Sequence, residues 1–234
     1  MHPATAGALV CAGGGVLAYA MRSKSSGLLG PSVYRGPGSR KALALTFDDG
    51  PSAGSMDLLK ILAKYRVKAT FFHCGVNIRR MPSVTSAVAR EGHEIGNHSD
   101  THPLMCFRAA DFIYSELARA QVTIQETTGV PASLFRAPYG VRWFGMREAQ
   151  RRLNLMGVMW TVIGLDWKLD AAGIAARLLA GAKNGAIFCL HDGRETLPRP
   201  DITPTIHAVE RAVPILLEQG FQFETVSQLL CQTN

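Results

Sequence analysis

The sequence predicts an α/β fold in which a parallel sheet, open or closed into a barrel, is covered by helices. Two observations support this class. From residue 41 onward, short apolar runs alternate with segments of helical periodicity. The stretch Ala42–Leu45 in the first run is continuously apolar, which indicates a strand buried on both faces. With 234 residues, 47% of them hydrophobic, the chain can bury one sizeable core. Ligands of such folds collect at the carboxyl ends of the strands.

The apolar runs give the predicted strands. The first is Ala42–Phe47, which stops at two adjacent aspartates and a Gly-Pro turn signal. The later runs are bounded in the same way by polar or turn residues. They are Ala69–Cys74, Glu94–Ile95 leading into Asn97, Leu134–Phe135, Val158–Ile163, Ala186–Leu190 and Phe221–Thr225.

Helical periodicity fills the segments between these runs. Ser55–Tyr65 places four leucine and isoleucine side chains on one broad face, and Ala110–Thr127 repeats apolar residues at helical spacing. Pro204–Gln219 is predicted to bend at Pro214. The remaining predicted helices are Ser83–Arg90, Arg147–Leu153, Gly173–Ala182 and a short helix at the tail.

The N-terminal region differs in composition. Residues 1–21 include an uncharged, mostly apolar stretch of about 18 residues, the lower limit for a membrane span, which predicts a signal peptide or an anchor. Residues 22–40 are rich in Gly, Ser and Pro and predict a linker, so the folded domain is expected over 41–234. We therefore expect a cell-envelope protein, secreted or membrane-anchored, with its orientation left open.

Charge and cysteine content narrow the classes of partner. The net charge of +7 indicates either a solvated basic surface or attraction to a membrane or an acidic glycan. No run of five basic residues occurs, so we do not expect a nucleic-acid partner. Five dispersed cysteines without a CxxC pair do not predict a disulfide framework or a structural zinc knot. Cys74 and Cys189 lie in apolar runs and are expected to be buried thiols.

Polar clusters at strand ends are the candidate functional residues. Asp48 and Asp49 repel one another, so they need solvent, a cationic partner or a metal ion. His98 and His102 would share a face if HSDTH turned helically, and Asp49 could supply a third ligand. Two histidines and one carboxylate make an open zinc site, whereas two surface histidines are the alternative.

Three further clusters follow along the chain. Arg136 in RAPYG could hold an aspartate by hydrogen bonds, or could stand on an ordinary turn. Asp166 and Trp167 follow the run VMWTVIG. His191 ends an apolar strand in LHDG and, taken alone, would be read as a capped core histidine.

Together, TFDDGP, HSDTH, RAPYG, DW and LHD in this order resemble the polysaccharide deacetylase family, also called the NodB-homology domain or carbohydrate esterase family four. The resemblance covers roughly residues 41–230. It implies a distorted (β/α) barrel with a divalent metal, commonly zinc. It also implies an acetylated glycan as substrate, because the family removes acetyl groups from N-acetylated amino sugars, and in some branches from xylan.

The resemblance implies a role for each cluster. Asp49, His98 and His102 would be the metal ligands, and Asp48 would be the general base, oriented by Arg136.

On the other side of the reacting bond, His191 would be the general acid and Asp166 would favour its charged form. The backbone N–H of Tyr139 would bind the oxyanion, and Trp167 would wall the substrate groove. One departure is Ile163, which stands where the family often has another aspartate.

Residues outside these motifs also carry expectations. Lys68 is expected either to pair with Asp166 or to be solvated, and His73 and His93 are expected to be structural. The loops Pro103–Arg108 and Arg194–Thr203 are expected to shape the groove, although neither shows a row of aromatic or acidic residues.

Two alternatives to an N-acetyl hydrolase follow from the same residues. One is an O-acetyl esterase or a deacylase of a lipid-linked sugar. The other is a catalytically silent glycan-binding protein, which predicts loss of the base, the acid or a metal ligand; none is lost here.

Overall fold

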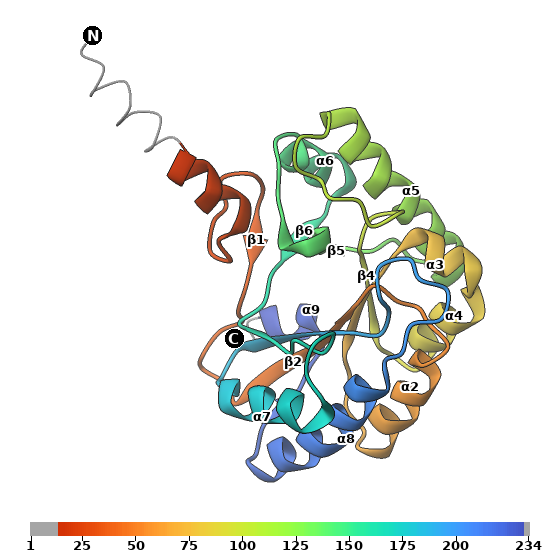
Figure 1. Cartoon of the computed structure of the whole chain (residues 1–234), viewed down its shortest axis with the longest axis vertical. Coiled ribbons are helices and arrows are strands. Elements are labelled where there is room, and N and C mark those ends of the chain that lie inside the picture. The colour runs from red at the N-terminus through yellow and green to blue at the C-terminus, as the bar shows by residue number, and fades with distance from the viewer. Residues whose placement is uncertain (1–13, 232–234) are drawn as a thin grey trace.

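A computed structural model describes residues 14–231 of the chain. Within these residues the centre is a nine-stranded sheet in which each pair of neighbouring strands is parallel. The strand order is β1-β6-β5-β4-β3-β2-β8-β7, and β9 pairs with β2. The sheet curls into a half-barrel with helices around its outside (Figure 1). The predicted α/β class and the distorted barrel are confirmed.

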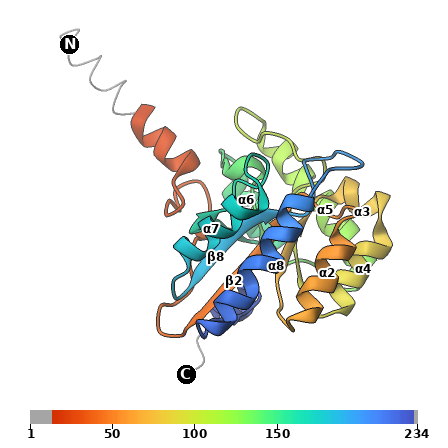
Figure 2. The same ribbon diagram turned by 60° about the horizontal axis from the view of Figure 1, so that its bottom comes forward.

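The strands are short. Their bounds are β1 Ser32–Val33, β2 Ala42–Asp48, β3 Thr70–His73, β4 Glu94–Asn97, β5 Leu134–Phe135, β6 Met156–Val158, β7 Val162–Ile163, β8 Ala186–His191 and β9 Gln222–Phe223. The two longest strands, β2 and β8, lie side by side in the middle of the domain (Figure 2).

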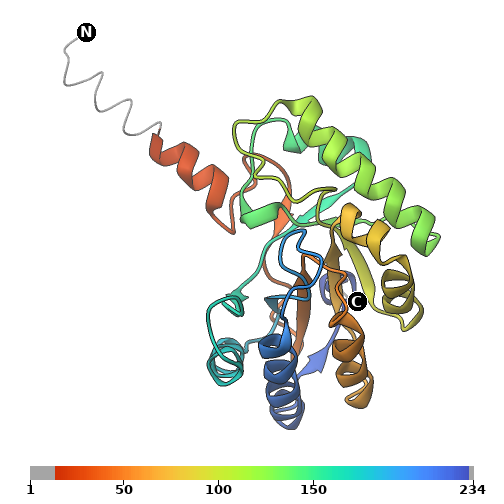
Figure 3. The ribbon, with the colours of Figure 1, turned by 45° about the vertical axis from the view of Figure 1, so that its right-hand side comes forward.

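Helices connect the strands and cover the sheet (Figure 3). Their bounds are α2 Ser55–Lys64, α3 Gly75–Arg80, α4 Pro82–Arg90, α5 Ala110–Thr128, the single 3-10 turn η1 Pro138–Gly140, α6 Met146–Leu153, α7 Ala171–Gly181, α8 Thr203–Glu218 and α9 Val226–Leu230. The helix α8 continues through Pro214 to Glu218.

Strand β2 explains why the sequence shows no polar alternation. Leu43, Leu45 and Phe47 point into the main core, where the Phe47 ring lies 5.0 Å from the ring of Phe71. Ala42 and Ala44 have the opposite orientation and belong to a second core, to which α9 contributes Val226 and Leu229. Burial on both faces stabilises the strand by roughly 1.5–3 kcal/mol for each large apolar side chain.

The predicted strand Val158–Ile163 is in fact two strands. β6 ends at Val158 and pairs with β1 and β5, whereas β7 begins at Val162 and pairs with β8. The chain crosses between two parts of the curled sheet at this point, so no single strand can satisfy both sets of partners. Periodicity within the run carries no information about which neighbours each residue will have.

Part of the predicted linker is built into the domain. β1 pairs with β6, and Arg142 donates hydrogen bonds to the carbonyls of Ser23 and Ser26 and to the hydroxyl of Ser32, the last at 2.9 Å. These contacts use backbone carbonyls and a hydroxyl, so the Gly-, Ser- and Pro-rich composition gave no sign of them.

The N-terminal apolar segment lies mostly outside the described residues, which begin at residue 14. Residues 14–22 form a helix that projects from the body of the domain (Figure 1). Within residues 14–231, no helix combines the length and apolar character needed to cross a membrane. The predicted division at residues 21 and 40 stays a prediction.

Candidate active site

The candidate residues meet at the carboxyl ends of the central strands. Asp48 is the last residue of β2 and lies in register with His191, the last residue of β8. His98 directly follows β4, and Arg136 directly follows β5. Parallel strands that end at one edge of the sheet bring these four side chains, distant in sequence, into one site.

Asp49, His98 and His102 form a buried cluster. The Oδ1 atom of Asp49 lies 3.1 Å from Nε2 of His98 and 3.1 Å from Nε2 of His102. The exposed fraction of each residue is at most 7%. The two histidines do not share a helical face as predicted, because Ser99 and His102 have left-handed backbone angles, with φ of 65° and 58°. The irregular turn still brings the two imidazoles together.

This donor set fits a divalent metal ion. Nδ1 of His98 lies 2.8 Å from the carbonyl oxygen of Arg136, so it donates there and leaves the Nε2 lone pair toward Asp49. Oδ2 of Asp49 accepts from the backbone N–H of Glu195 at 2.8 Å, while Oδ1 is buried without a hydrogen-bond partner among the described residues. Ligands of a tetrahedral zinc ion are separated by about 3.3 Å, close to the observed spacing, and three protein ligands leave one position open.

Asp48 is held by a fully buried arginine. Nη1 of Arg136 donates to Oδ1 of Asp48 at 2.6 Å and to the hydroxyl of Thr46 at 2.6 Å. Its other nitrogens donate to the carbonyls of Val158 and Met159, at 3.1 and 3.3 Å. The exposed fraction is 0% for Arg136 and 4% for Asp48. The expected contact between the two residues is present, and the network fixes the carboxylate in one orientation.

The second carboxylate oxygen of Asp48 has a partner that the sequence analysis did not assign. The Cys189 thiol donates to Oδ2 at 3.5 Å. Burial, and then the charge of Asp48, raise the pKa of this thiol well above its usual value, so it stays protonated and able to donate. Cys189 and Cys74 are both buried, as predicted.

His191 is oriented by Asp166. Nδ1 of His191 lies 2.8 Å from Oδ1 of Asp166, and its backbone N–H donates to Oδ2 at 2.8 Å. Thr205 donates to the same Oδ2 at 2.7 Å. Burial lowers the pKa of His191, but the hydrogen bond and charge of Asp166 outweigh burial and raise that pKa to about 9. The imidazolium form is therefore favoured at neutral pH.

Lys68 does not pair with Asp166. Its ammonium group donates to the carbonyl oxygen of Glu91, whereas the partners of Asp166 are His191, Thr205 and Arg194. The pairing predicted from sequence was wrong because a lysine that precedes β3 begins at the amino end of the sheet, opposite the site.

Two aromatic residues stand half-exposed beside these groups. Tyr139 has a left-handed φ of 58°, and its ring centroid lies 4.7 Å from that of His102. Its hydroxyl donates to Oε1 of Glu195 at 2.9 Å, and burial followed by this contact raises the pKa of Tyr139 to about 12. The ring of Trp167 meets that of His191 edge-on, with centroids 5.3 Å apart.

Sequence reasoning missed several supporting residues. The Asn77 amide donates to the carbonyls of Asp49 and Glu195, at 2.7 and 2.8 Å, and joins two loops of the site. Asn77 lies in the first turn of α3, which begins two residues after β3 ends, so its distance from the end of an apolar run was only a weak signal. Glu195 gave none, since it reaches Asp49 through its backbone N–H.

A second buried cluster, centred on Asp192, is connected to the site through Asp48. Asp192 accepts from the Ser55 hydroxyl at 2.6 Å, and its Oδ2 lies 3.4 Å from Nε2 of His73. The backbone N–H of Asp192 also donates to the carbonyl of Asp48 at 3.0 Å. His73 is thus buried in a structural network. His93 accepts from the backbone N–H of Ala69 at 3.2 Å, so both histidines are structural, as expected.

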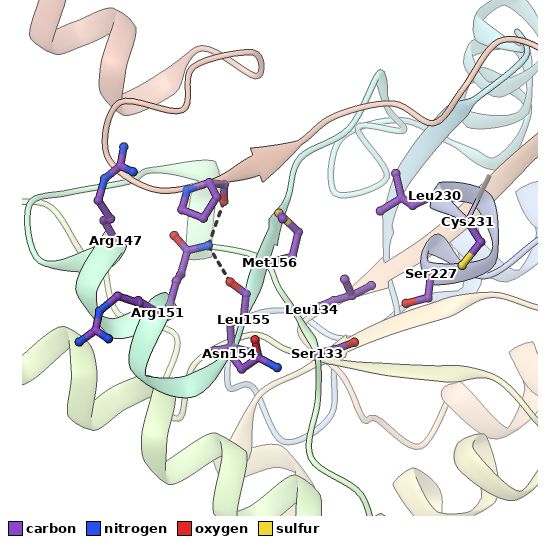
Figure 4. Close-up of a pocket in the computed structure, with 12 residues that line it drawn as sticks. Ser133, Leu134, Arg147, Arg151, Asn154, Leu155, Met156, Ser227, Leu230 and Cys231 are labelled. Atoms are coloured by element: carbon purple, nitrogen blue, oxygen red, sulfur yellow. Dashed lines mark hydrogen bonds between the residues drawn. The ribbon is translucent and has the colours of Figure 1, made fainter.

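A cavity of about 740 Å³ lies elsewhere, between β5, β6, α6 and α9. Its lining includes Leu134, Met156 and Leu230 (Figure 4). Gln150, which also lines the cavity, donates hydrogen bonds to the carbonyls of Pro31 and Leu155, at 3.0 and 3.3 Å. None of the predicted site residues lines this cavity.

The comparisons with known proteins agree on one family. Residues 35–158 match the family model described as polysaccharide deacetylase. The peptidoglycan-N-acetylglucosamine deacetylase PgdA of Listeria monocytogenes is 32% identical over 193 residues, covering 82% of this chain and 39% of that protein. A chitooligosaccharide deacetylase of Bradyrhizobium sp. is 31% identical over 200 residues, covering 81% of this chain and 90% of that protein. The chain thus spans about two fifths of PgdA.

Solved structures share the fold. The Bc1960 peptidoglycan N-acetylglucosamine deacetylase superposes with a TM-score of 0.79 at 29% identity, covering 84% of this chain and 91% of that one. BA3943 of Bacillus anthracis, described as a pseudoenzyme of carbohydrate esterase family four, superposes with a TM-score of 0.76 at 27% identity. It covers 86% of this chain and 69% of that one. The same fold is therefore found both in a deacetylase and in a protein described as a pseudoenzyme, so the fold alone does not establish catalysis.

Proposed function

Because the chain belongs to the polysaccharide deacetylase family, we propose that it is a metal-dependent hydrolase that removes N-acetyl groups from an amino-sugar glycan of the peptidoglycan or chitin type. The observation that carries this proposal is the buried set of Asp49, His98 and His102, with Asp48 on one side and a charged His191 nearby. A fold shared with a pseudoenzyme would not suffice, whereas a complete set of acid, base and ligands supports catalysis.

Asp49, His98 and His102 would hold the ion, which we propose to be zinc because two imidazoles and a carboxylate suit it. When bound, the ion would lower the pKa of a water molecule and polarise the acetyl carbonyl. Two hydrogen bonds hold these ligands in place. Nδ1 of His98 donates to the carbonyl of Arg136, and the backbone N–H of Glu195 donates to Asp49. Both contacts fix the ligand orientation.

Asp48 would act as the general base. It would take one proton from water while the water oxygen attacks the acetyl carbon. Arg136 holds one carboxylate oxygen at 2.6 Å and Cys189 lies at the other, so the base is fixed before substrate binds. The backbone N–H of Tyr139 would donate to the carbonyl oxygen as it gains negative charge.

His191 would act as the general acid. It would donate its Nε2 proton to the amide nitrogen as the carbon–nitrogen bond breaks, leaving acetate and a free amine on the sugar. Amide cleavage needs this donor because an amine anion is a poor leaving group. The contact between Asp166 and Nδ1 supports the role, since it favours the protonated ring at neutral pH. Trp167, half-exposed beside this ring, would wall the groove.

The proposed location is the cell envelope, where peptidoglycan is found. Membrane association through the N-terminal apolar segment is part of the proposal and depends on residues that are mainly outside the described range. An O-acetyl esterase would use the same base and metal ligands. It would depend less on His191, because an alkoxide leaves more readily than an amine anion.

The test uses the full 234-residue chain, because residues 23–33 pack against the domain. The protein is stripped of metal, reloaded with zinc and assayed for acetate release from N-acetylglucosamine oligomers and from peptidoglycan. We expect zinc-dependent release that Asp48→Asn and His191→Ala each reduce by at least about 100-fold. Ester hydrolysis without amide hydrolysis would favour the esterase. Zinc binding without hydrolysis of either would favour the silent binding protein.

A further inference from the structure

A second group of metal-ligating side chains lies beside the set already described. Asp48, Cys189 and His191 each offer one ligand atom, and these three atoms all lie within 4.8 Å of one another. Within residues 14–231, this group and the candidate metal ligands described above are the two that are arranged in this way. General acid–base catalysis by Asp48 and His191 does not require a thiol between them, so the sulfur atom calls for a separate explanation.

The central strands hold the three residues in place. Cys189 and His191 are two residues apart on β8, so their side chains project from the same face of the sheet. Asp48 ends β2 and is the register partner of His191. Side chains on two paired strands are positioned more precisely than side chains on loops, which favours a preformed ligand group.

The spacing of the sulfur and oxygen atoms fits a zinc ion. Sγ of Cys189 lies 3.5 Å from Oδ2 of Asp48. With zinc–sulfur and zinc–oxygen bonds of about 2.3 and 2.0 Å, these two ligands of a tetrahedral ion are about 3.5 Å apart. The distance that suits the hydrogen bond of the thiol therefore also suits an ion that replaces the thiol proton.

His191 is arranged like a metal-binding histidine. Such histidines usually donate their second ring N–H to a carboxylate, and here Nδ1 of His191 lies 2.8 Å from Oδ1 of Asp166. Nε2 is left as the ring nitrogen that can bind an ion. The side chain of His191 is 15% exposed, whereas Cys189 is 1% exposed. An ion therefore reaches the group from the side of His191.

We propose that Asp48, Cys189 and His191 form a second zinc site, which inhibits the protein when it is filled. Zinc forms one bond to each side chain, and the thiol proton of Cys189 and the Nε2 proton of His191 are released to solvent. The thiolate and the carboxylate balance the two charges of the ion, as a buried site requires. Sulfur and imidazole ligands select zinc over magnesium or calcium.

The second ion binds more weakly than the first. It competes with two protons, one on the thiol and one on the imidazole. Arg136 also places a positive charge beside the group, because its Nη1 lies 2.6 Å from Oδ1 of Asp48. The first zinc ion therefore fills the set of two histidines and Asp49, and the second binds only when zinc is in excess.

Inhibition rests on the proposed function, because the second ion occupies the proposed base and the proposed acid together. With zinc on Asp48, the carboxylate cannot take a proton from water. With zinc on Nε2, His191 has no proton to give to the leaving nitrogen. The site itself does not depend on this function and is measurable without turnover.

Cobalt titration of the metal-free, full-length chain distinguishes the two sites. Co²⁺ takes the place of zinc, and a sulfur-to-cobalt charge-transfer band in the near ultraviolet arises only when a thiolate binds the ion. The set of Asp49, His98 and His102 contains no sulfur. We therefore expect no band with the first equivalent of cobalt and a band that grows with the second.

Two serine variants identify the thiolate. Cys189→Ser removes the sulfur and keeps a hydroxyl that can donate to Asp48, and we expect it to abolish the band. Cys74→Ser is the matched control, since Cys74 is also fully buried but donates to the carbonyl of His98, at 3.7 Å. It is expected to keep the band. If Cys189→Ser does not fold, His191→Ala replaces it and is expected to weaken the second cobalt ion by at least about tenfold.

Zinc measurements test stoichiometry and inhibition. In equilibrium dialysis against excess zinc, we expect the wild-type chain to hold one more ion than Cys189→Ser. Acetate release by the wild-type chain is expected to fall by about 100-fold at saturating zinc, as for loss of a general base. Relative to its own rate with one zinc ion, Cys189→Ser is expected to need at least about tenfold more zinc for the same inhibition.

The results that would overturn the proposal are distinct. Absence of the band at every cobalt concentration, a band retained in Cys189→Ser, or equal zinc stoichiometry in the two proteins would exclude the site. A second ion that binds without slowing acetate release would exclude inhibition. If the wild-type chain released no acetate at any zinc concentration, the proposed function would fail, while the cobalt band and the stoichiometry would still decide whether the second site exists.

Discussion

The contact between Asp166 and His191 allows a quantitative prediction of how activity depends on pH. His191 has a pKa of about 9, raised from the usual 6.5 by Asp166 against the opposing effect of burial. In Asp166→Asn the carboxylate is gone, while burial, which lowers the pKa, and the charges of Asp49 and Asp48, which raise it, remain, so the pKa is expected to fall toward the usual 6.5. At pH 8 the protonated fraction is about 0.9 for a pKa of about 9 and about 0.03 for a pKa of 6.5. We therefore expect about a 30-fold loss of activity at this pH.

The sign of the effect distinguishes a proton donor from a structural role. A raised pKa keeps the acid protonated until the pH passes about 9, so the alkaline limb of kcat is expected near that value in the wild-type protein. In Asp166→Asn the limb is expected to move toward about 6.5, and the loss nearly disappears at pH 5.5. Thr205→Val keeps Asp166 and removes only one hydrogen bond to it, so its limb is expected to move much less.

The assay is acetate release from an N-acetylglucosamine oligomer by zinc-loaded protein, followed from pH 5.5 to 9.5. Circular dichroism at each pH confirms that the variants stay folded. An unchanged alkaline limb in Asp166→Asn, with activity lowered equally at every pH, would refute the assignment of His191 as a proton donor positioned by Asp166.

Three further predictions concern stability and metal binding. Arg136→Met leaves the buried Asp48 unpaired and is expected to lower the free energy of unfolding by about 3–5 kcal/mol in urea titrations; a loss below about 1 kcal/mol would contradict the buried pair. His98→Ala is expected to weaken zinc binding more than about 100-fold in competition with a chromophoric chelator, and equal affinity would exclude His98 as a ligand. Phe47→Ala, in the main core, is expected to cost about 3–5 kcal/mol, against about 1 kcal/mol or less for the partly exposed control Met56→Ala.

The strand-end rule made most of the site predictable. Five site residues each end or directly follow a strand: Asp48, Asp49, His98, Arg136 and His191. The parallel sheet brings the carboxyl ends of these strands to one edge. Residue type then limited the chemistry, because two imidazoles and a carboxylate suit a transition metal. The fold class was predictable for a similar reason, since a strand buried on both faces leaves an uninterrupted apolar run.

What could not be predicted depends on backbone geometry and on partners distant in sequence. The turn through His102 is irregular and not helical, because two residues of HSDTH adopt positive φ. Glu195 contributes a backbone N–H, which any residue could supply. Phe107 and Trp143 come from two loops distant in sequence, and only their ring contact in the structure shows that these loops meet.

The central claim is that one ion at Asp49, His98 and His102 is needed for amide hydrolysis. The most direct test adds zinc in steps to metal-free wild-type protein and follows acetate release from an N-acetylglucosamine oligomer. We predict no release without metal and a rate that rises linearly to a plateau at one zinc per chain, with His102→Ala showing no plateau at that ratio. Full release from metal-free protein, or equal zinc dependence in His102→Ala, would contradict the account.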